Sequence, residues 1–361
     1  MGFLSSIVSI LGLQSHSPHN SQKLATIQKL QNGPPSPYHI YGNESYQVMM
    51  SDFRVMMGYA YTINCDLSRS FPPNATELEN IHPSVLVKAI YNKDSTNGAL
   101  VAYNDFFKVI VVSFRSTVTK KLWFQNLEMF KTHWPLEPIY HIPSSSNEPG
   151  VNTSTGRLVK WNSSSHHVKT ESSNIPKRPN YIVPEGVSIH YGFSKGYRSI
   201  RLEIMLLVAR LARKHPDYRI TFTGHSLGAS LAEIAAVDYS IYMAPQQDLD
   251  RIWAFSYAAP RNGNRKYSNF VNSLPFAQNG QLIRINRYRD PTPLLPGKIL
   301  GYEHSWRQYT MWDDLSVTPC DDPGNGECPS SAVFWTGNIN LHRAKKYLEF
   351  FEMTISCHEI S

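Results

Sequence analysis

The stretch that decides the fold is TGHSLGA, residues 223–229, just past the middle of the 361-residue chain. It places Ser226 two residues from a glycine on each side, in the pattern G-x-S-x-G. The β-type residues 218–224 precede the motif, and the helix-forming residues 230–242 follow it. A serine between a predicted strand and a predicted helix, with glycines where the two elements crowd, is typical of a nucleophile held on a sharp turn. The free N–H groups at the start of the helix would then face the site.

Strands and helices alternate on both sides of this motif. Residues 108–116 form a continuous apolar run, as expected for a strand that is buried on both faces. The alternation predicts an α/β fold with a mainly parallel central sheet flanked by helices. The other predicted strands cover 84–91, 98–104, 251–259 and 281–288, and the other predicted helices cover 46–63, 193–214 and 266–274.

The chain divides into a leader and one domain. Residues 1–45 are a leader and spacer, and their apolar start has the length of a signal peptide but is too short to span a membrane. Residues 46–361 form the predicted single domain, which carries a Ser-, Asn- and Pro-rich surface insertion at 141–180. We expect a secreted protein; if the leader is not cleaved, the alternative is an intracellular or membrane-associated protein.

The composition of the chain limits the kinds of partner that the protein is expected to bind. The net charge of +7 comes from scattered Lys and Arg residues without a recognisable binding module, which argues against nucleic acid as a partner. The four cysteines form no C-x-x-C pair, so we expect no metal site, and their even number suits disulfide bonds in an oxidising compartment. Mild further support for secretion comes from four N-x-[ST] glycosylation sequons, at Asn43, Asn74, Asn152 and Asn162.

A catalytic serine needs a histidine base and a carboxylate that orients the base. In α/β hydrolases these follow in the order serine, acid, histidine. Asp290 comes directly after the strand predicted at 281–288, and this placement favours it as the acid. Its competitors lie in less defined loops, at Asp313, Asp314, Asp321 and Asp322. For the base, His304 and His342 both remain candidates at this point.

Five ordered motifs together resemble the class 3 lipases, the family of extracellular triacylglycerol lipases from filamentous fungi and yeasts. The resemblance runs from about residue 48 to 357. The motifs are VVSFRST (111–117), TGHSLGA (223–229), APRNGN (259–264), RDPTPLLP (289–296), and CDDPGNGEC (320–328) followed by NINLHRAKKYLEFF (338–351). The resemblance implies an α/β-hydrolase fold with a short lid.

The resemblance also implies roles for particular residues. The catalytic triad would be Ser226, Asp290 and His342. Thr117 would supply one oxyanion donor, and the backbone N–H of Leu227 would supply the other.

The lid would be VTKKLWFQNL, residues 118–127. Its apolar side chains Leu122, Trp123 and Phe124 would cover the serine in water and move onto a lipid surface. Three features depart from the family pattern: Ser116 replaces the usual glycine of the oxyanion turn, Leu122 replaces the usual asparagine of the lid, and the segment H-R-A-K-K-Y that begins at His342 replaces H-x-x-Y-F.

The cysteines fit the same family pattern. Cys320 and Cys328 would close a small loop just before His342, and Cys65 and Cys357 would tie the first helix of the domain to the C-terminus.

The resemblance and the motifs together predict a carboxylic-ester hydrolase, a triacylglycerol lipase that acts on lipid esters at an interface. It would need neither a metal nor an organic cofactor, and it would contact a membrane or droplet peripherally. The alternatives are a phospholipase A1 or a feruloyl-type esterase on the same fold, or a catalytically weakened lipid-binding relative.

Overall fold

The structure is a computed structural model that describes residues 43–65, 84–92, 97–116, 130–134, 136, 181–320 and 337–355. Several predicted features lie outside these residues: most of the leader, the insertion at 141–180, the lid at 118–127, and Thr117.

An eight-stranded sheet forms the centre of the described part, in the order β1-β2-β3-β6-β7-β8-β9-β10. From β3 to β9 neighbouring strands pair in parallel, whereas β1–β2, β2–β3 and β9–β10 are antiparallel. The predicted mainly parallel central sheet is therefore confirmed. The strands are β1 (Ser84–Tyr91), β2 (Gly98–Asn104), β3 (Val109–Phe114), β6 (Arg219–His225), β7 (Ile252–Tyr257), β8 (Leu282–Arg287), β9 (Gln308–Met311) and β10 (Val317–Cys320), with β4 (Lys131–His133) and β5 (Ser188–His190) in a separate two-stranded sheet.

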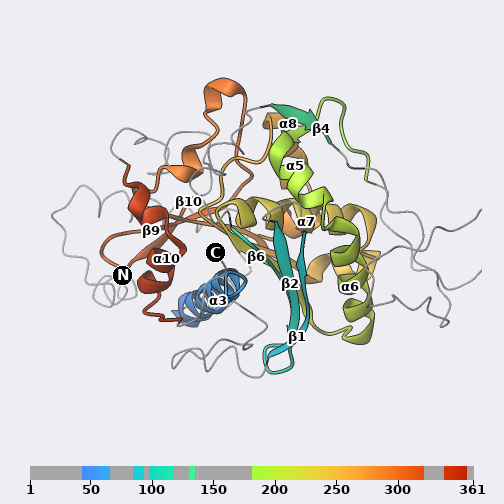
Figure 1. The fold of residues 1–361 in the computed structure, drawn as a ribbon, viewed down its shortest axis with the longest axis horizontal. Helices are drawn as coiled ribbons and strands as arrows, with labels where there is room; N and C mark the ends of the chain where they lie inside the picture. Colours follow the sequence, from blue (N-terminus) through green and yellow to red (C-terminus); the bar gives the residue numbers. More distant parts are fainter. Residues whose placement is uncertain are drawn as a thin grey trace, which may run out of the picture.

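Helices cover both faces of this sheet. Figure 1 shows α3 and α10 on one side of it and α5, α6 and α7 on the other. The α-helices are α3 (Asn43–Thr62), α5 (Tyr191–Arg198), α6 (Arg201–Lys214), α7 (Leu227–Tyr242), α8 (Arg265–Asn272), α9 (Pro275–Gln278) and α10 (Ala344–Phe350). Short 3-10 helices are η2 (Gln246–Arg251), η3 (Thr292–Leu294), η4 (Lys298–Leu300) and η7 (Ile339–His342).

Strand β3 shows why two cores form. Successive side chains of a strand point to opposite faces of the sheet. Ile110 and Val112 accordingly join the core under α5, α6 and α7, while Val109 and Val111 join the core under α3 and α10. The continuous apolar run of this strand is needed because neither of its faces meets water.

The predicted helix at 193–214 is wrong in one respect, because the structure has two helices there. The hydroxyl of Ser199 donates to the carbonyl of Gly196 at 2.7 Å, and Ile200 leaves the helical conformation at φ −126°, ψ −3°. The break turns α6 away from α5. Tyr197 and Arg201, on either side of it, then reach the same buried carboxylate of Asp238 on α7.

Candidate active site

The turn between β6 and α7 holds Ser226 in a strained conformation. Ser226 has φ 58° and ψ −123°, in the left-handed half of conformational space that residues other than glycine rarely adopt. A Cβ atom on Gly224 would overlap the backbone of Gly228, and one on Gly228 would overlap the carbonyl of Phe114 at the end of β3. Both glycines are therefore required for α7 to start this close to the sheet, as the motif predicts.

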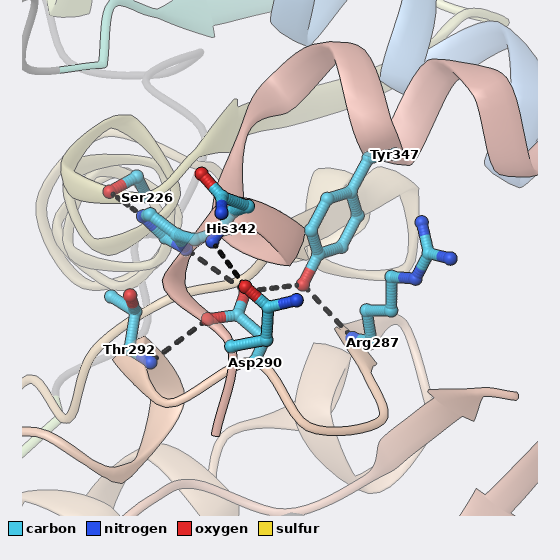
Figure 2. A network of polar contacts seen from close by, with 8 residues as sticks. Ser226, Arg287, Asp290, Thr292, His342 and Tyr347 are labelled. Carbon is cyan, nitrogen blue, oxygen red and sulfur yellow. Dashed lines mark hydrogen bonds and ion pairs between the residues drawn. The ribbon is translucent and has the colours of Figure 1, made fainter. Parts of the chain in front are cut away.

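Three side chains from distant parts of the chain meet at this turn. Nε2 of His342 lies 2.7 Å from Oγ of Ser226, and Nδ1 of His342 lies 2.9 Å from Oδ2 of Asp290 (Figure 2). Ser226 comes from the start of α7, Asp290 follows β8, and His342 ends η7 just before α10. An imidazole that bonds a carboxylate through one nitrogen and a serine hydroxyl through the other can accept the hydroxyl proton when the serine attacks a carbonyl.

The carboxylate of Asp290 is buried and fully engaged. Its Oδ1 accepts the backbone N–H of Thr292 at 2.9 Å, and its Oδ2 accepts the hydroxyl of Tyr347 at 2.9 Å (Figure 2). Burial alone would raise the pKa of Asp290, but the charge and hydrogen bond of His342, together with these two donors, outweigh it and hold the pKa below its ordinary value. The carboxylate therefore stays ionised and can hold the imidazole in one orientation.

Sequence reasoning missed Tyr347. Its hydroxyl accepts the backbone N–H of Arg287 at 2.9 Å while it donates to Asp290, so it joins the end of β8 to the acid. The only signal in the sequence was a tyrosine five residues after His342, in the segment that departs from the family spacing.

The competing candidates lie elsewhere. His304 is partly buried, and its Nε2 pairs with the carbonyl of Pro293 at 2.6 Å. Burial, together with the charges of Arg284 and Arg261, lowers the pKa of His304 well below its ordinary value, so its ring is neutral. Of the alternative acids, Asp313 pairs with Arg287 at the surface and Asp314 bonds Ser316. Asp321 and Asp322 lie outside the described residues.

The predicted oxyanion donors are described only in part. Leu227 is the first residue of α7, where backbone N–H groups have no partner within a helix. The hydrogen bonds to the Ser226 carbonyl come from the backbone N–H groups of Ala229 and Ser230, two and three residues after Leu227. Ser116, which replaces the usual glycine next to Thr117, donates its hydroxyl to Asn64 at 3.2 Å.

Two of the four cysteines lie within the described residues. Cys65 and Cys320 are each part of a disulfide bond. Cys328 and Cys357 lie outside the described residues, so the pairing stays a prediction. No group of three or more His, Cys, Asp or Glu side chains in the described ranges is placed to hold a metal ion. In the same ranges, no helix is long and apolar enough to cross a membrane.

Curated proteins that the chain resembles are lipases. It is 26% identical over 204 residues to the secreted mono- and diacylglycerol lipase LIP1 of Malassezia globosa, covering 56% of this chain and 60% of that protein. It is 31% identical over 184 residues to the secreted mono- and diacylglycerol lipase 1 of Fusarium solani, covering 49% and 50%. The chain thus spans between half and two thirds of the length of these relatives.

Solved structures with a similar fold include lipases. The Rhizomucor miehei lipase–propeptide complex superimposes with a TM-score of 0.62 at 18% identity, covering 86% of this chain and 83% of that one. Lipase II from Rhizopus niveus superimposes with a TM-score of 0.61 at 19% identity, covering 82% and 93%. These likenesses confirm the predicted α/β-hydrolase fold.

The family assignment rests on the central part of the chain. Residues 111–299, more than half of the chain, match the family described as Lipase (class 3). The match includes the end of β3, the Ser226 turn and the loop that carries Asp290. The chain therefore belongs to the class 3 lipase family.

Proposed function

We propose that this protein is a serine ester hydrolase that cleaves acylglycerol esters at a lipid surface. The observation that carries the proposal is the hydrogen-bonded chain from Ser226 through His342 to Asp290. Two further findings support it: the family match, and relatives that are named as mono- and diacylglycerol lipases.

The reaction would proceed in two halves. Oγ of Ser226 attacks the acyl carbonyl carbon while Nε2 of His342 takes the hydroxyl proton. Asp290 stabilises the resulting imidazolium, and the backbone N–H of Leu227, with Thr117, binds the oxyanion of the tetrahedral intermediate. The intermediate collapses, the bond to the alcohol breaks, and His342 returns the proton to the departing alkoxide. Water then attacks the acyl-serine by the same steps and releases the fatty acid.

The geometry favours an active enzyme over the lipid-binding alternative. A relative that had lost turnover would have no reason to keep His342 within hydrogen-bond distance of both Ser226 and Asp290. The altered spacing after His342 thus gives no support to a loss of activity.

The central test is hydrolysis of a dissolved short-chain chromogenic ester by wild type and by Ser226→Ala. Loss of a triad member lowers kcat by about 10⁴- to 10⁶-fold, and the variant should remain folded. Ser240→Ala, on the same helix with its hydroxyl bonded to Val237, is the matched control and should retain wild-type kcat. Hydrolysis at a similar rate by folded Ser226→Ala protein would rule the proposal out. Parallel assays with triacylglycerol, diacylglycerol and phospholipid would then separate a lipase from a phospholipase A1.

Exposed apolar side chains support action at a lipid surface. Ile299 is 97% exposed and Phe130 is 75% exposed. They belong to segments that contact each other, since Lys131 donates to the Leu300 carbonyl and Tyr302 donates to the Phe130 carbonyl. In Figure 1 the start of β4 and the orange turn after β8 accordingly lie side by side at the top of the molecule. Moving apolar side chains at this position from water into a lipid surface would lower the free energy.

The interfacial part of the proposal has its own test. Ile299→Ser should lower the rate on an emulsified ester several-fold and leave the rate on a dissolved ester unchanged. Ile182→Ser is the control, because Ile182 is 85% exposed but lies in another part of the molecule. It follows Tyr181, which lies near Asp250 beside the start of β7. Equal effects of the two substitutions on the emulsion would show that Ile299 does not enter the lipid. The lid at 118–127, with Trp123 at its centre, is proposed to open at the same surface.

Secretion and the disulfide bonds complete the proposal. The relatives are named as secreted proteins, which supports an extracellular enzyme. We expect the bonds Cys65–Cys357 and Cys320–Cys328. Peptide mapping without reduction tests them, and swapped pairs or free thiols would refute the assignment.

A further inference from the structure

His225, the residue before the nucleophile, packs directly against the proposed base. It ends β6 and is only 3% exposed. Its ring centroid lies 4.9 Å from that of His342, with 36° between the ring planes. It lies 5.2 Å from the ring of Tyr347, which it meets edge to face at 66°. One side chain thus contacts both the base and the tyrosine that holds Asp290.

A histidine is a costly residue at this position. Both of its ring nitrogens are buried, and within the described part of the chain neither makes a well-formed hydrogen bond, since the backbone of His342 offers only a weak one. Burying polar nitrogens without partners lowers the stability of the folded protein, and an apolar ring of similar shape would avoid this penalty. General packing therefore does not account for the contact with His342.

The groups that face His225 keep it uncharged. Burial and the charge of His342 lower the pKa of His225 to about 3, against weaker opposing effects of Asp290 and of the His342 backbone. The ring is therefore neutral across the pH range in which an esterase is assayed. A neutral aromatic ring can lie against the imidazolium that forms during the reaction, whereas a charged one would repel it.

The hydrogen bonds of His342 leave one motion uncontrolled. Its ring is held at Nδ1 by Asp290 and at Nε2 by Ser226, and both partners lie at the edge of the ring. A swing of the ring about its side-chain bonds would lengthen and bend both hydrogen bonds. A contact on the face of the ring opposes that swing, and among the residues with described ring contacts, His225 makes that contact.

We propose that His225 is a positioning residue, a neutral aromatic wall that fixes the rotation of the His342 ring between Asp290 and Ser226. The role rests on the proposed hydrolase function. Its effect would fall on kcat, because the alignment of the base matters for proton transfer and not for substrate binding.

The test compares His225→Ala, which removes the ring, with His225→Phe, which keeps a ring without the buried nitrogens. With a dissolved short-chain ester, His225→Ala should lower kcat by about tenfold or more and leave KM within about twofold. His225→Phe should keep kcat within about threefold of wild type and melt at the same or a higher temperature.

His190→Ala is the matched control. His190 is also a buried histidine that stacks on an aromatic ring, that of Phe193 at 4.0 Å, and burial lowers its pKa to about 4. Its loss should lower the melting temperature and leave kcat unchanged. Full kcat in His225→Ala would overturn the proposal. Equal losses of kcat in the Ala and Phe variants would overturn it as well.

A measurement without turnover separates this proposal from the hydrolase function. In protein labelled with ¹⁵N-histidine, the Nδ1–H proton of His342, which bonds Asp290, should give one sharp downfield signal in wild type and in His225→Phe. The signal should broaden or move upfield in His225→Ala, because an unsupported ring bonds the carboxylate less well. If wild type hydrolysed no ester, the hydrolase function would fail, and this spectrum would still decide whether His225 orders the ring. The same sharp downfield signal in all three proteins would contradict the positioning role.

Discussion

The hydroxyl of Tyr347 donates to Oδ2 of Asp290 at 2.9 Å, the same carboxylate oxygen that bonds Nδ1 of His342. Tyr347 in turn accepts the backbone N–H of Arg287, which fixes its hydroxyl hydrogen toward the acid. One buried oxygen therefore receives two donors, from α10 and from η7, and the orientation of the acid depends on both.

Tyr347→Phe should weaken this arrangement without removing any of the three proposed catalytic side chains. A hydrogen bond to a charged group contributes about 1.5–3 kcal/mol, so we expect the free energy of unfolding to fall by a similar amount and kcat to fall about tenfold. Urea unfolding and steady-state kinetics with a dissolved ester measure the two effects. Tyr257→Phe, which removes a buried hydroxyl bonded to the Phe53 carbonyl, should lower stability alone. A kcat in Tyr347→Phe equal to that of the control would show that the tyrosine does not act on the acid.

Asp290 should contribute a pH-dependent part of the stability. Its folded pKa lies below its unfolded value of about 3.9, so the folded state favours the charged carboxylate. The stabilisation is then fully present above pH 4 and is lost as the pH falls through the folded pKa. The difference in unfolding free energy between wild type and Asp290→Asn should therefore be constant from pH 7 to about pH 5 and shrink below pH 4. A difference that grows on acidification would have the wrong sign for a depressed pKa.

Replacement by glutamine should lower kcat strongly at His342 and only slightly at His304. His342→Gln removes the base and should lower kcat by about 10⁴-fold or more. His304→Gln should stay within about tenfold of wild type, because its ring bonds the Pro293 carbonyl and not the serine. Kinetics with a dissolved ester distinguish the two variants. An inactive His304→Gln protein beside an active His342→Gln protein would mean that the wrong histidine has been assigned.

The helix that starts at Ser226 depends on a buried ion pair. The carboxylate of Asp238 on α7 is fully buried and bonds Arg201 through both oxygens and Tyr197 through one. Arg201→Ala leaves this charge without its cation and should cost about 3–5 kcal/mol of unfolding free energy. Lys108→Ala removes the exposed pair with Asp217 and should cost less than about 1 kcal/mol. Similar losses in chemical denaturation would indicate that Asp238 finds other partners.

Patterns within short segments predicted the frame of the site. The apolar run of β3, the glycines around Ser226 and the position of Asp290 just after β8 are local features, and the structure has each of them as expected. The family resemblance supplied His342, which the residues alone left in competition with His304.

Two kinds of feature could not be predicted from the sequence: an interruption within a periodic helix pattern, and contacts between distant segments. The apolar stripe of 193–214 continues through the break at Ser199 and Ile200, so its periodicity hides the end of α5. Arg284 lies in a strand pattern yet is fully buried, because it donates to the Ser305 carbonyl and to Gln308. Burial lowers its pKa to about 9. Its partners lie 21 and 24 residues away, and only the fold brings them together.

Covalent labelling by a phosphate triester with a nitrophenol leaving group, followed by mass spectrometry of the peptides, tests most directly whether Ser226 is the nucleophile. If Ser226 is the nucleophile activated by His342, the wild type should release one equivalent of nitrophenolate and carry the phosphoryl group on Ser226 alone. Ser226→Ala should not be labelled, and His342→Ala should react about 10⁴-fold more slowly. A label on another residue, or labelling of Ser226 at the wild-type rate in His342→Ala, would show that Ser226 is not a nucleophile activated by His342.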